Sequence, residues 1–178
     1  MNVLFLGQKP FGEAAYFMLM QSSLNVVAVC TNRDPAGWWQ TNRIARLFKG
    51  PIIGNEERHE SQLLQAIRDN KVDMLISVQH PWLLSRAVLE AVGYSAINFH
   101  NGKLPDYRGR QAAARAIENG DTEYTVTCHR IDEGMDTGDI LDELTFPVVH
   151  PTTVDRLYRM ADMMALVLFN RVLQRMTA

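Results

Sequence analysis

The sequence predicts an α/β fold with a mostly parallel, twisted sheet and helices on both of its faces. Short apolar runs rich in β-branched residues recur along the chain and end in glycine or in other turn-forming residues. Segments with a helical spacing of apolar residues separate these runs. Because the strand-like runs are almost continuously apolar, both faces of the sheet should be covered, as in parallel sheets.

The individual elements follow from these patterns in order. We expect strands at residues 3–6, 25–31, 73–78, 95–100, 125–130 and 140–147. We expect helices at residues 13–20, 61–70, 85–91, 111–118 and about 152–176. The first strand ends at Gly7, and the second, "NVVAVCT", ends in the turn-forming "NRDPAG". With no internal repeat, low-complexity tract or linker, we expect one domain over residues 1–178.

Composition and charge exclude several classes of protein. The 178 residues are 47% apolar with a net charge of −2, so no basic field predicts a nucleic-acid partner. The N-terminus lacks the features of a signal peptide, and no apolar stretch approaches the length of a membrane span. The two cysteines, Cys30 and Cys128, lie in separate apolar segments and predict buried thiols rather than a metal site. We expect a cytoplasmic protein without a membrane or metal site.

Ligands of open α/β sheets bind at the carboxyl ends of the strands. The relevant loops follow Leu6, Thr31, Val78 and Ile97, and three of the four carry unusual residues: "GQKPFG", "QHPW" and "NFHNGKLP". The "GQKPFG" loop resembles a dinucleotide fingerprint only loosely, which makes a nucleotide-binding oxidoreductase module a rival hypothesis.

The strand at residues 95–100 ends in an amide and an imidazole. Alternation places Asn98 and His100 on the same side of this strand. An Asn amide can stabilise the oxyanion that forms when a carbonyl is attacked, and a nearby His can either donate to the same oxygen or accept the proton of the nucleophile. On their own, the two residues also fit a turn cap and a strand-end histidine that is satisfied by local hydrogen bonds.

A second polar segment, "DEGMDTGDI", joins the two last predicted strands. It is either a solvated hairpin loop or the source of a carboxylate that orients His100. Spacing alone leaves open which of its acids would be the partner.

Both segments carry a resemblance to a known family. "INFHNGKLPDYRGR" followed by "TVTCHRIDEGMDTGDIL" resembles the formyltransferases that use 10-formyltetrahydrofolate. The resemblance covers essentially the whole chain and implies their Rossmann-like fold. It implies a catalytic triad of Asn98, His100 and Asp136, with loop or structural roles for Asp132 and Asp139. The implied reaction is attack by a substrate amine on the formyl carbon, with no metal.

The resemblance also implies binding residues. Its folate pocket falls on Pro81, Trp82, Leu83, Leu84, Ile131, Asp132 and Met135. Contacts to the acceptor substrate are expected from Lys9, Gly102, Lys103 and Arg108. Where many relatives have Pro-Ser or Gly-Ser after the catalytic His, this chain has Asn101-Gly102, which leaves the acceptor open.

The acceptor is expected to be a small primary amine, most consistently an amino sugar linked to a nucleotide. "HNGKLPDYRGR" and the "NRDPAGWWQTNRIARL" segment resemble the sugar-modifying branch. The alternatives are a glycinamide ribonucleotide formyltransferase, a formyltetrahydrofolate hydrolase, and a non-catalytic nucleotide- or folate-binding module. A tRNA partner is not expected, because the chain has one C-terminal helix and no basic surplus.

The last predicted helix suggests an oligomer. It is apolar on more than one face in "MADMMALVLF", so it is either buried in its own domain or covered by a second subunit. We therefore predict that the protein forms a homodimer.

Overall fold

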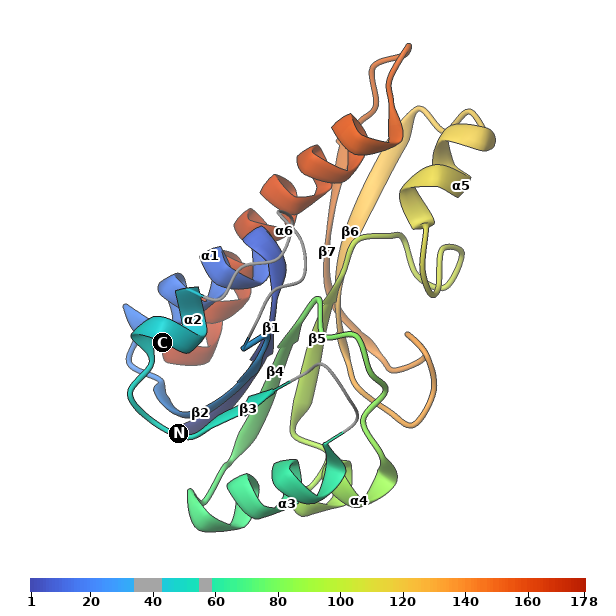
Figure 1. The fold of residues 1–178 in the computed structure, drawn as a ribbon. Helices are drawn as coiled ribbons and strands as arrows, with labels where there is room; N and C mark the ends of the chain where they lie inside the picture. The colour runs from blue at the N-terminus through green and yellow to red at the C-terminus, as the bar shows by residue number, and fades with distance from the viewer. Residues whose placement is uncertain (34–42, 55–58) are drawn as a thin grey trace.

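The computed structural model describes residues 1–33, 43–54 and 59–178 of the chain. Within these residues the strands form one seven-stranded sheet (Figure 1). The strands are β1 (Asn2–Gly7), β2 (Asn25–Thr31), β3 (Ile52–Gly54), β4 (Met74–Val78), β5 (Ala96–His100), β6 (Glu123–Arg130) and β7 (Ile140–Pro147).

The sheet has the order β3-β2-β1-β4-β5-β6-β7. The pairs from β3 to β5 are parallel, whereas β6 pairs antiparallel with both β5 and β7. The mostly parallel sheet of the prediction is therefore confirmed. The direction of winding reverses between β1 and β4, so a crevice is expected outside the carboxyl ends of these two strands.

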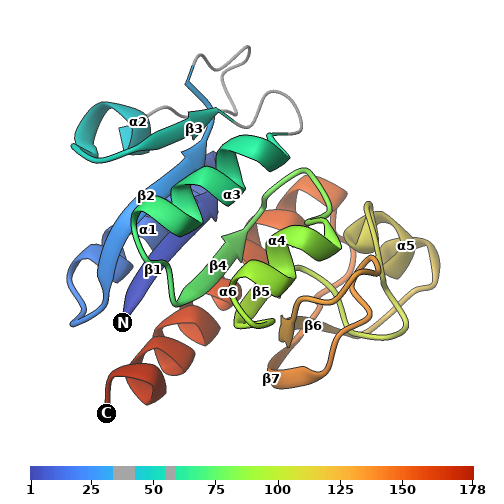
Figure 2. The same ribbon diagram turned by 90° about the horizontal axis from the view of Figure 1, so that it is seen from below.

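Helices cover both faces of the sheet. They are α1 (Lys9–Met20), α2 (Arg43–Leu47), α3 (Glu60–Asp69), α4 (Arg86–Ala91), α5 (Ala112–Glu118) and α6 (Val154–Thr177). Helices α1, α2 and α6 lie on one face and α3 and α4 on the other, as Figure 2 shows from below. Alternate residues of β1 enter the two cores, with Phe5 on the α1 and α6 side and Leu6 on the α3 and α4 side.

The long helix α6 is held mainly by its own domain. Its buried positions recur every three or four residues and form one stripe against the sheet. Thr153 caps its N-terminus by accepting a hydrogen bond from the backbone N–H of Arg156 at 3.2 Å. Met163 and Val167 remain more than half exposed on the other side. No helix in the described part of the chain is long and apolar enough to cross a membrane.

Two short elements were not predicted from the sequence. The prediction had a loop where the structure forms α2 and β3, which have five and three residues. Elements this short carry too little periodicity to detect. Helix α1 begins at Lys9 rather than at residue 13, because Pro10 is tolerated in the first turn of a helix.

Candidate active site

A cavity of about 740 Å³ lies at the carboxyl ends of β1, β4 and β5. Its walls come from the loops after β1 and β4, the end of β5, the start of α5, the β6–β7 loop and α6. Of the four strand ends at which binding was predicted, those after Leu6, Val78 and Ile97 contribute to the lining, whereas the described residues after Thr31 do not. The cavity thus occupies the crevice expected from the strand order.

The Asn98 amide is held from both neighbouring strands. The register places Ser77 of β4 and His129 of β6 on either side of Asn98. The Ser77 hydroxyl donates to Asn98 Oδ1 at 2.9 Å, and Asn98 Nδ2 donates to His129 Nε2 at 3.1 Å. His129 Nδ1 lies 2.7 Å from the carbonyl of Arg130. Since a carbonyl only accepts, Nδ1 carries the proton and Nε2 offers its lone pair to Asn98.

The hydrogen bond to His129 occupies only one of the two N–H groups of the Asn98 amide. An amide nitrogen has two N–H groups, of which His129 takes one. Asn98 lines the cavity, so the second N–H is a donor for a ligand oxygen. The carboxamide is fixed in this orientation before any ligand arrives.

His100 has a similarly defined tautomer. Its Nε2 lies 2.7 Å from the backbone carbonyl of Tyr107 and therefore carries the proton. The lone pair is then on Nδ1, which lies 3.5 Å from Asp136 Oδ2. Burial lowers the pKa of His100, while the Asp136 charge and the Tyr107 carbonyl act in the opposite direction. The imidazole therefore has a backbone carbonyl at Nε2 and a carboxylate beside Nδ1.

Asp136 lies between two histidines. Besides the His100 contact, its Oδ1 is 3.5 Å from His129 Nε2, and its Oδ2 accepts the backbone N–H of Gly109 at 2.8 Å. Burial alone would raise the pKa of the Asp136 carboxyl, yet this pKa lies below its ordinary value, and the hydrogen bond from the Gly109 N–H is one of the causes. Asp136 is thus ionised at neutral pH.

The loop that carries Asp136 depends on local backbone geometry. Asp136 has a φ of 53°, in the left-handed region that Asp tolerates better than most residues. A Cβ on Gly138 would lie 2.1 Å from the carbonyl oxygen of Arg130, so only glycine fits beside the end of β6. These two features direct the carboxylate back over β5.

Taken together, the three groups are suited to attack on a carbonyl. The amide offers a donor for a developing oxyanion, the imidazole offers a base, and the carboxylate stabilises the imidazole once it is protonated. The acid of the β6–β7 loop that partners His100, left open by spacing, is Asp136 in the structure.

Most of the residues predicted to bind folate line this same cavity. They are Pro81, Trp82, Leu83, Leu84, Ile131 and Met135. Leu83 and Met135 keep 49% and 50% of their surface exposed, which gives the cavity an apolar wall available to a ring. Asp132 is the exception, because it does not line the cavity. Its Oδ1 accepts from the N–H of Gly134 at 3.0 Å and so shapes the loop.

The residues predicted to bind the acceptor divide differently. Only Lys9 lines the cavity, at the start of α1 with a φ of 61°. Gly102 is buried instead, and a Cβ there would lie 2.8 Å from His100 Nε2, so this glycine makes room for the imidazole. Arg108 donates from Nε to the carbonyl of Asp136 at 3.1 Å. The structure places these two residues against His100 and Asp136 rather than on the cavity wall.

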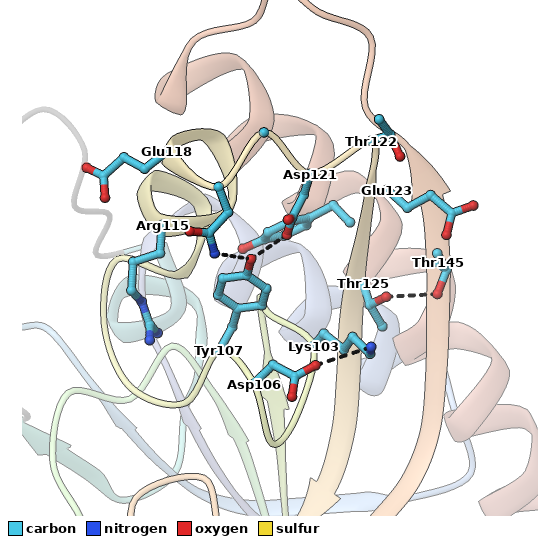
Figure 3. Close-up of a pocket in the computed structure, with 13 residues that line it drawn as sticks. Lys103, Asp106, Tyr107, Arg115, Glu118, Asp121, Thr122, Glu123, Thr125 and Thr145 are labelled. Atoms are coloured by element: carbon cyan, nitrogen blue, oxygen red, sulfur yellow. Dashed lines mark hydrogen bonds and ion pairs between the residues drawn. The ribbon is translucent and has the colours of Figure 1, made fainter.

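Lys103 lies in a second cavity, of about 790 Å³, on the other side of the loop that follows β5. Its ammonium forms an ion pair with Asp106 at 3.2 Å (Figure 3). The loop reverses direction here because the N–H of Tyr107 donates to the Lys103 carbonyl at 2.7 Å. Lys103 consequently lines this second cavity and not the one that contains Asn98, His100 and Asp136.

Sequence reasoning missed a polar cluster at the α6 side of the main cavity. Asp162 Oδ1 accepts from Asn101 Nδ2 at 2.6 Å and from Gln79 Nε2 at 3.1 Å, and Gln79 Nε2 also donates to the Tyr158 hydroxyl at 3.0 Å. Burial raises the pKa of Asp162 to about 6, although Asn101, Lys9 and Gln79 oppose the shift. Gln79, Asn101, Tyr158 and Lys9 line the cavity, with Asp162 connecting two of them.

Comparison with known proteins identifies the family. Residues 1–173 match the formyl transferase family over nearly the whole chain. The chain belongs to this family. It is 31% identical over 147 residues to a methionyl-tRNA formyltransferase of Kosmotoga olearia, covering 79% of this chain and 47% of that protein. The chain therefore spans about half the length of this curated relative.

Solved structures show the same fold. A phosphoribosylglycinamide formyltransferase from Bacillus halodurans superposes with a TM-score of 0.84 at 20% identity, covering 99% of this chain and 95% of that one. A formyltetrahydrofolate deformylase from Pseudomonas syringae pv. tomato superposes with a TM-score of 0.80 at 15% identity, covering 96% of this chain and 58% of that one. The predicted α/β formyltransferase fold is confirmed.

Proposed function

We propose that this protein transfers the formyl group of 10-formyltetrahydrofolate to a primary amine of a small substrate. The observation that carries the proposal is the convergence of Asn98, His100 and Asp136 on one cavity, in a chain of the formyl transferase family. The cavity, of about 740 Å³, is within the size range of cofactor and ligand pockets. Its apolar wall at Leu83 and Met135 suits a planar pterin ring.

Each catalytic group then has a role. The folate supplies a formyl carbonyl as the electrophile. Asn98 donates its remaining N–H to the carbonyl oxygen as negative charge develops there. His100 accepts the proton of the attacking amine at Nδ1 and returns it to the departing folate nitrogen, while the bond from the formyl carbon to that nitrogen breaks. Asp136 stabilises the imidazolium between these two transfers.

We further propose that the acceptor is an amino sugar linked to a nucleotide. The Tyr107-Arg108-Gly109-Arg110 motif supports this through its resemblance to sugar-modifying relatives. The second segment with that resemblance, residues 32–47, lies partly outside the described residues. The polar cluster of Gln79, Asn101 and Tyr158, with Lys9 beside it, suits the hydroxyl and phosphate groups of such a substrate.

The proposal is tested by incubating the protein with 10-formyltetrahydrofolate and a panel of acceptors. The panel contains nucleotide-linked amino sugars, glycinamide ribonucleotide and methionyl-tRNA, and mass spectrometry reports the formylated product. A mass gain on an amino sugar supports both parts of the proposal. A gain on glycinamide ribonucleotide or methionyl-tRNA supports the reaction and refutes the acceptor. Formate release without any formylated acceptor refutes the transferase and supports a hydrolase.

A further inference from the structure

Tyr107, in the loop that follows β5, lines the second cavity and contacts His100 of the main cavity through its backbone. Its backbone carbonyl faces His100 in the catalytic cavity, and its phenol lies in the second cavity (Figure 3). We infer that Tyr107 is a positioning residue whose phenol, held in the second cavity, sets the tautomer of His100 through its own backbone carbonyl. The inference extends the proposed function and rests on it for the catalytic meaning of His100.

The phenol of Tyr107 is held by two partners at the turn between α5 and β6. Its hydroxyl donates to Asp121 Oδ2 and accepts from Asn119 Nδ2, the latter at 2.9 Å. The hydroxyl therefore uses both its donor and an acceptor position. Because Asn119 and Asp121 directly follow α5, the side chain of Tyr107 is tied to a helix end rather than to another part of its own loop.

Arg115 of α5 completes the attachment. Its guanidinium lies over the Tyr107 ring, 5.4 Å from the centroid, and its Nη2 donates to the carbonyl of Arg108 at 2.6 Å. Helix α5 thus contacts both the side chain of Tyr107 and the next peptide unit of the loop. These contacts fix where the Tyr107 carbonyl lies relative to β5.

The position of that carbonyl selects between two forms of neutral His100. With the carbonyl 2.7 Å from Nε2, the proton resides on Nε2 and the lone pair on Nδ1. Asp136 favours the opposite form, because its carboxylate, 3.5 Å from Nδ1, attracts a proton there. If the Tyr107 carbonyl withdraws, Asp136 is expected to draw the proton to Nδ1, which moves the lone pair to Nε2 and away from the nitrogen that would accept the proton of the amine.

The other ionisable groups around His100 do not take over the role of the Tyr107 carbonyl as the acceptor for Nε2. They are Asp136, His129 and Arg115. Of these, His129 already uses Nδ1 on the Arg130 carbonyl and Nε2 on Asn98, so its ring offers no further acceptor to His100. The Tyr107 carbonyl is the acceptor that the structure places on Nε2.

The test is Tyr107→Phe, which removes the hydroxyl and keeps the ring under Arg115. The matched control is Tyr94→Phe, which removes a hydroxyl that donates to exposed Glu133 at 3.1 Å, away from His100. In protein labelled with ¹⁵N-histidine, the ¹⁵N shifts of His100 are expected to move toward the Nδ1–H tautomer in Tyr107→Phe and to stay unchanged in the control. We expect kcat to fall about tenfold in Tyr107→Phe while KM for folate changes less than twofold.

Partner variants separate positioning from general stability. Asp121→Asn keeps an oxygen acceptor for the phenol and should preserve the His100 shifts, whereas Asp121→Ala should reproduce Tyr107→Phe. If Tyr107→Phe does not fold, Asn119→Ala removes one of the two phenol partners and provides the same readout. A folded Tyr107→Phe with His100 shifts and a pH profile like those of the control would overturn the inference. Because the NMR readout needs no turnover, a tautomer change in a protein without formylation activity would refute only the proposed function.

Discussion

Replacing Asp136 with Asn tests how much the carboxylate contributes to the site. The change keeps an oxygen that can accept the Gly109 N–H and removes the negative charge 3.5 Å from His100 Nδ1. At that separation, and at an effective dielectric constant of about 20, two unit charges interact by about 5 kcal/mol. Solvation in the open cavity reduces this, so we expect a loss of about 2–4 kcal/mol of transition-state stabilisation, or a fall in kcat of roughly 30- to 10³-fold.

The assay is steady-state formyl transfer across a range of pH. The Asp136 charge raises the pKa of His100, so its removal should lower that pKa and move the acidic limb of the pH profile to lower pH. Asp139→Asn is the matched control, since Asp139 is an exposed acid of the same loop. A loss in kcat below tenfold, or an unshifted acidic limb, would contradict the role given to the carboxylate.

Three further predictions concern the surroundings of the triad. Gly102→Ala places a Cβ 2.8 Å from His100 Nε2. We therefore expect kcat to fall and the free energy of unfolding to decrease by about 1–3 kcal/mol. A fully active variant would contradict the steric argument. Asn98→Ala should lower kcat by about 10²- to 10³-fold. Ser77→Ala should lower it less, because this variant loses the hydrogen bond that holds the Asn98 amide but keeps the amide itself. Equal losses would refute this order. The folded pKa of Asp162 is about 6 against 3.8 for a free carboxyl. The free energy of unfolding should therefore fall by up to about 3 kcal/mol as pH rises through that window. Urea titrations of Asp162→Asn should lack this fall.

Much of the fold could be predicted because its strands are buried on both faces. Apolar runs bounded by turn residues located β2 and β7 with their observed bounds and β4, β5 and β6 to within two residues at either end. Alternation correctly placed Asn98 and His100 on one face of β5, since period two is a direct consequence of strand geometry. Asp136 was indicated by the resemblance to the formyltransferases and not by the spacing of the acids.

The remaining parts of the site depend on contacts that no local pattern encodes. His129 faces Asn98 because β6 pairs antiparallel with β5 in one particular register, which the sequence of β6 alone does not specify. Lys103 was placed at the acceptor, but the turn closed by Tyr107 directs it into the second cavity. The cluster around Asp162 joins residues of α6 and of the loops after β4 and β5, which are far apart in the chain.

The predicted homodimer remains a prediction. Helix α6 buries one stripe in its own domain and leaves Met163 and Val167 exposed. Light scattering over a dilution series would show whether a dimer persists.

The most direct test of the central claim is a single-turnover measurement of formyl transfer with Asn98→Ala and Asp136→Ala beside the unaltered protein. Folate binding is followed in parallel by fluorescence of the bound cosubstrate. We predict that both variants still bind 10-formyltetrahydrofolate while formyl transfer to the amine falls by at least about 100-fold. Transfer at an undiminished rate in either folded variant would contradict the assignment of this cavity as the catalytic site.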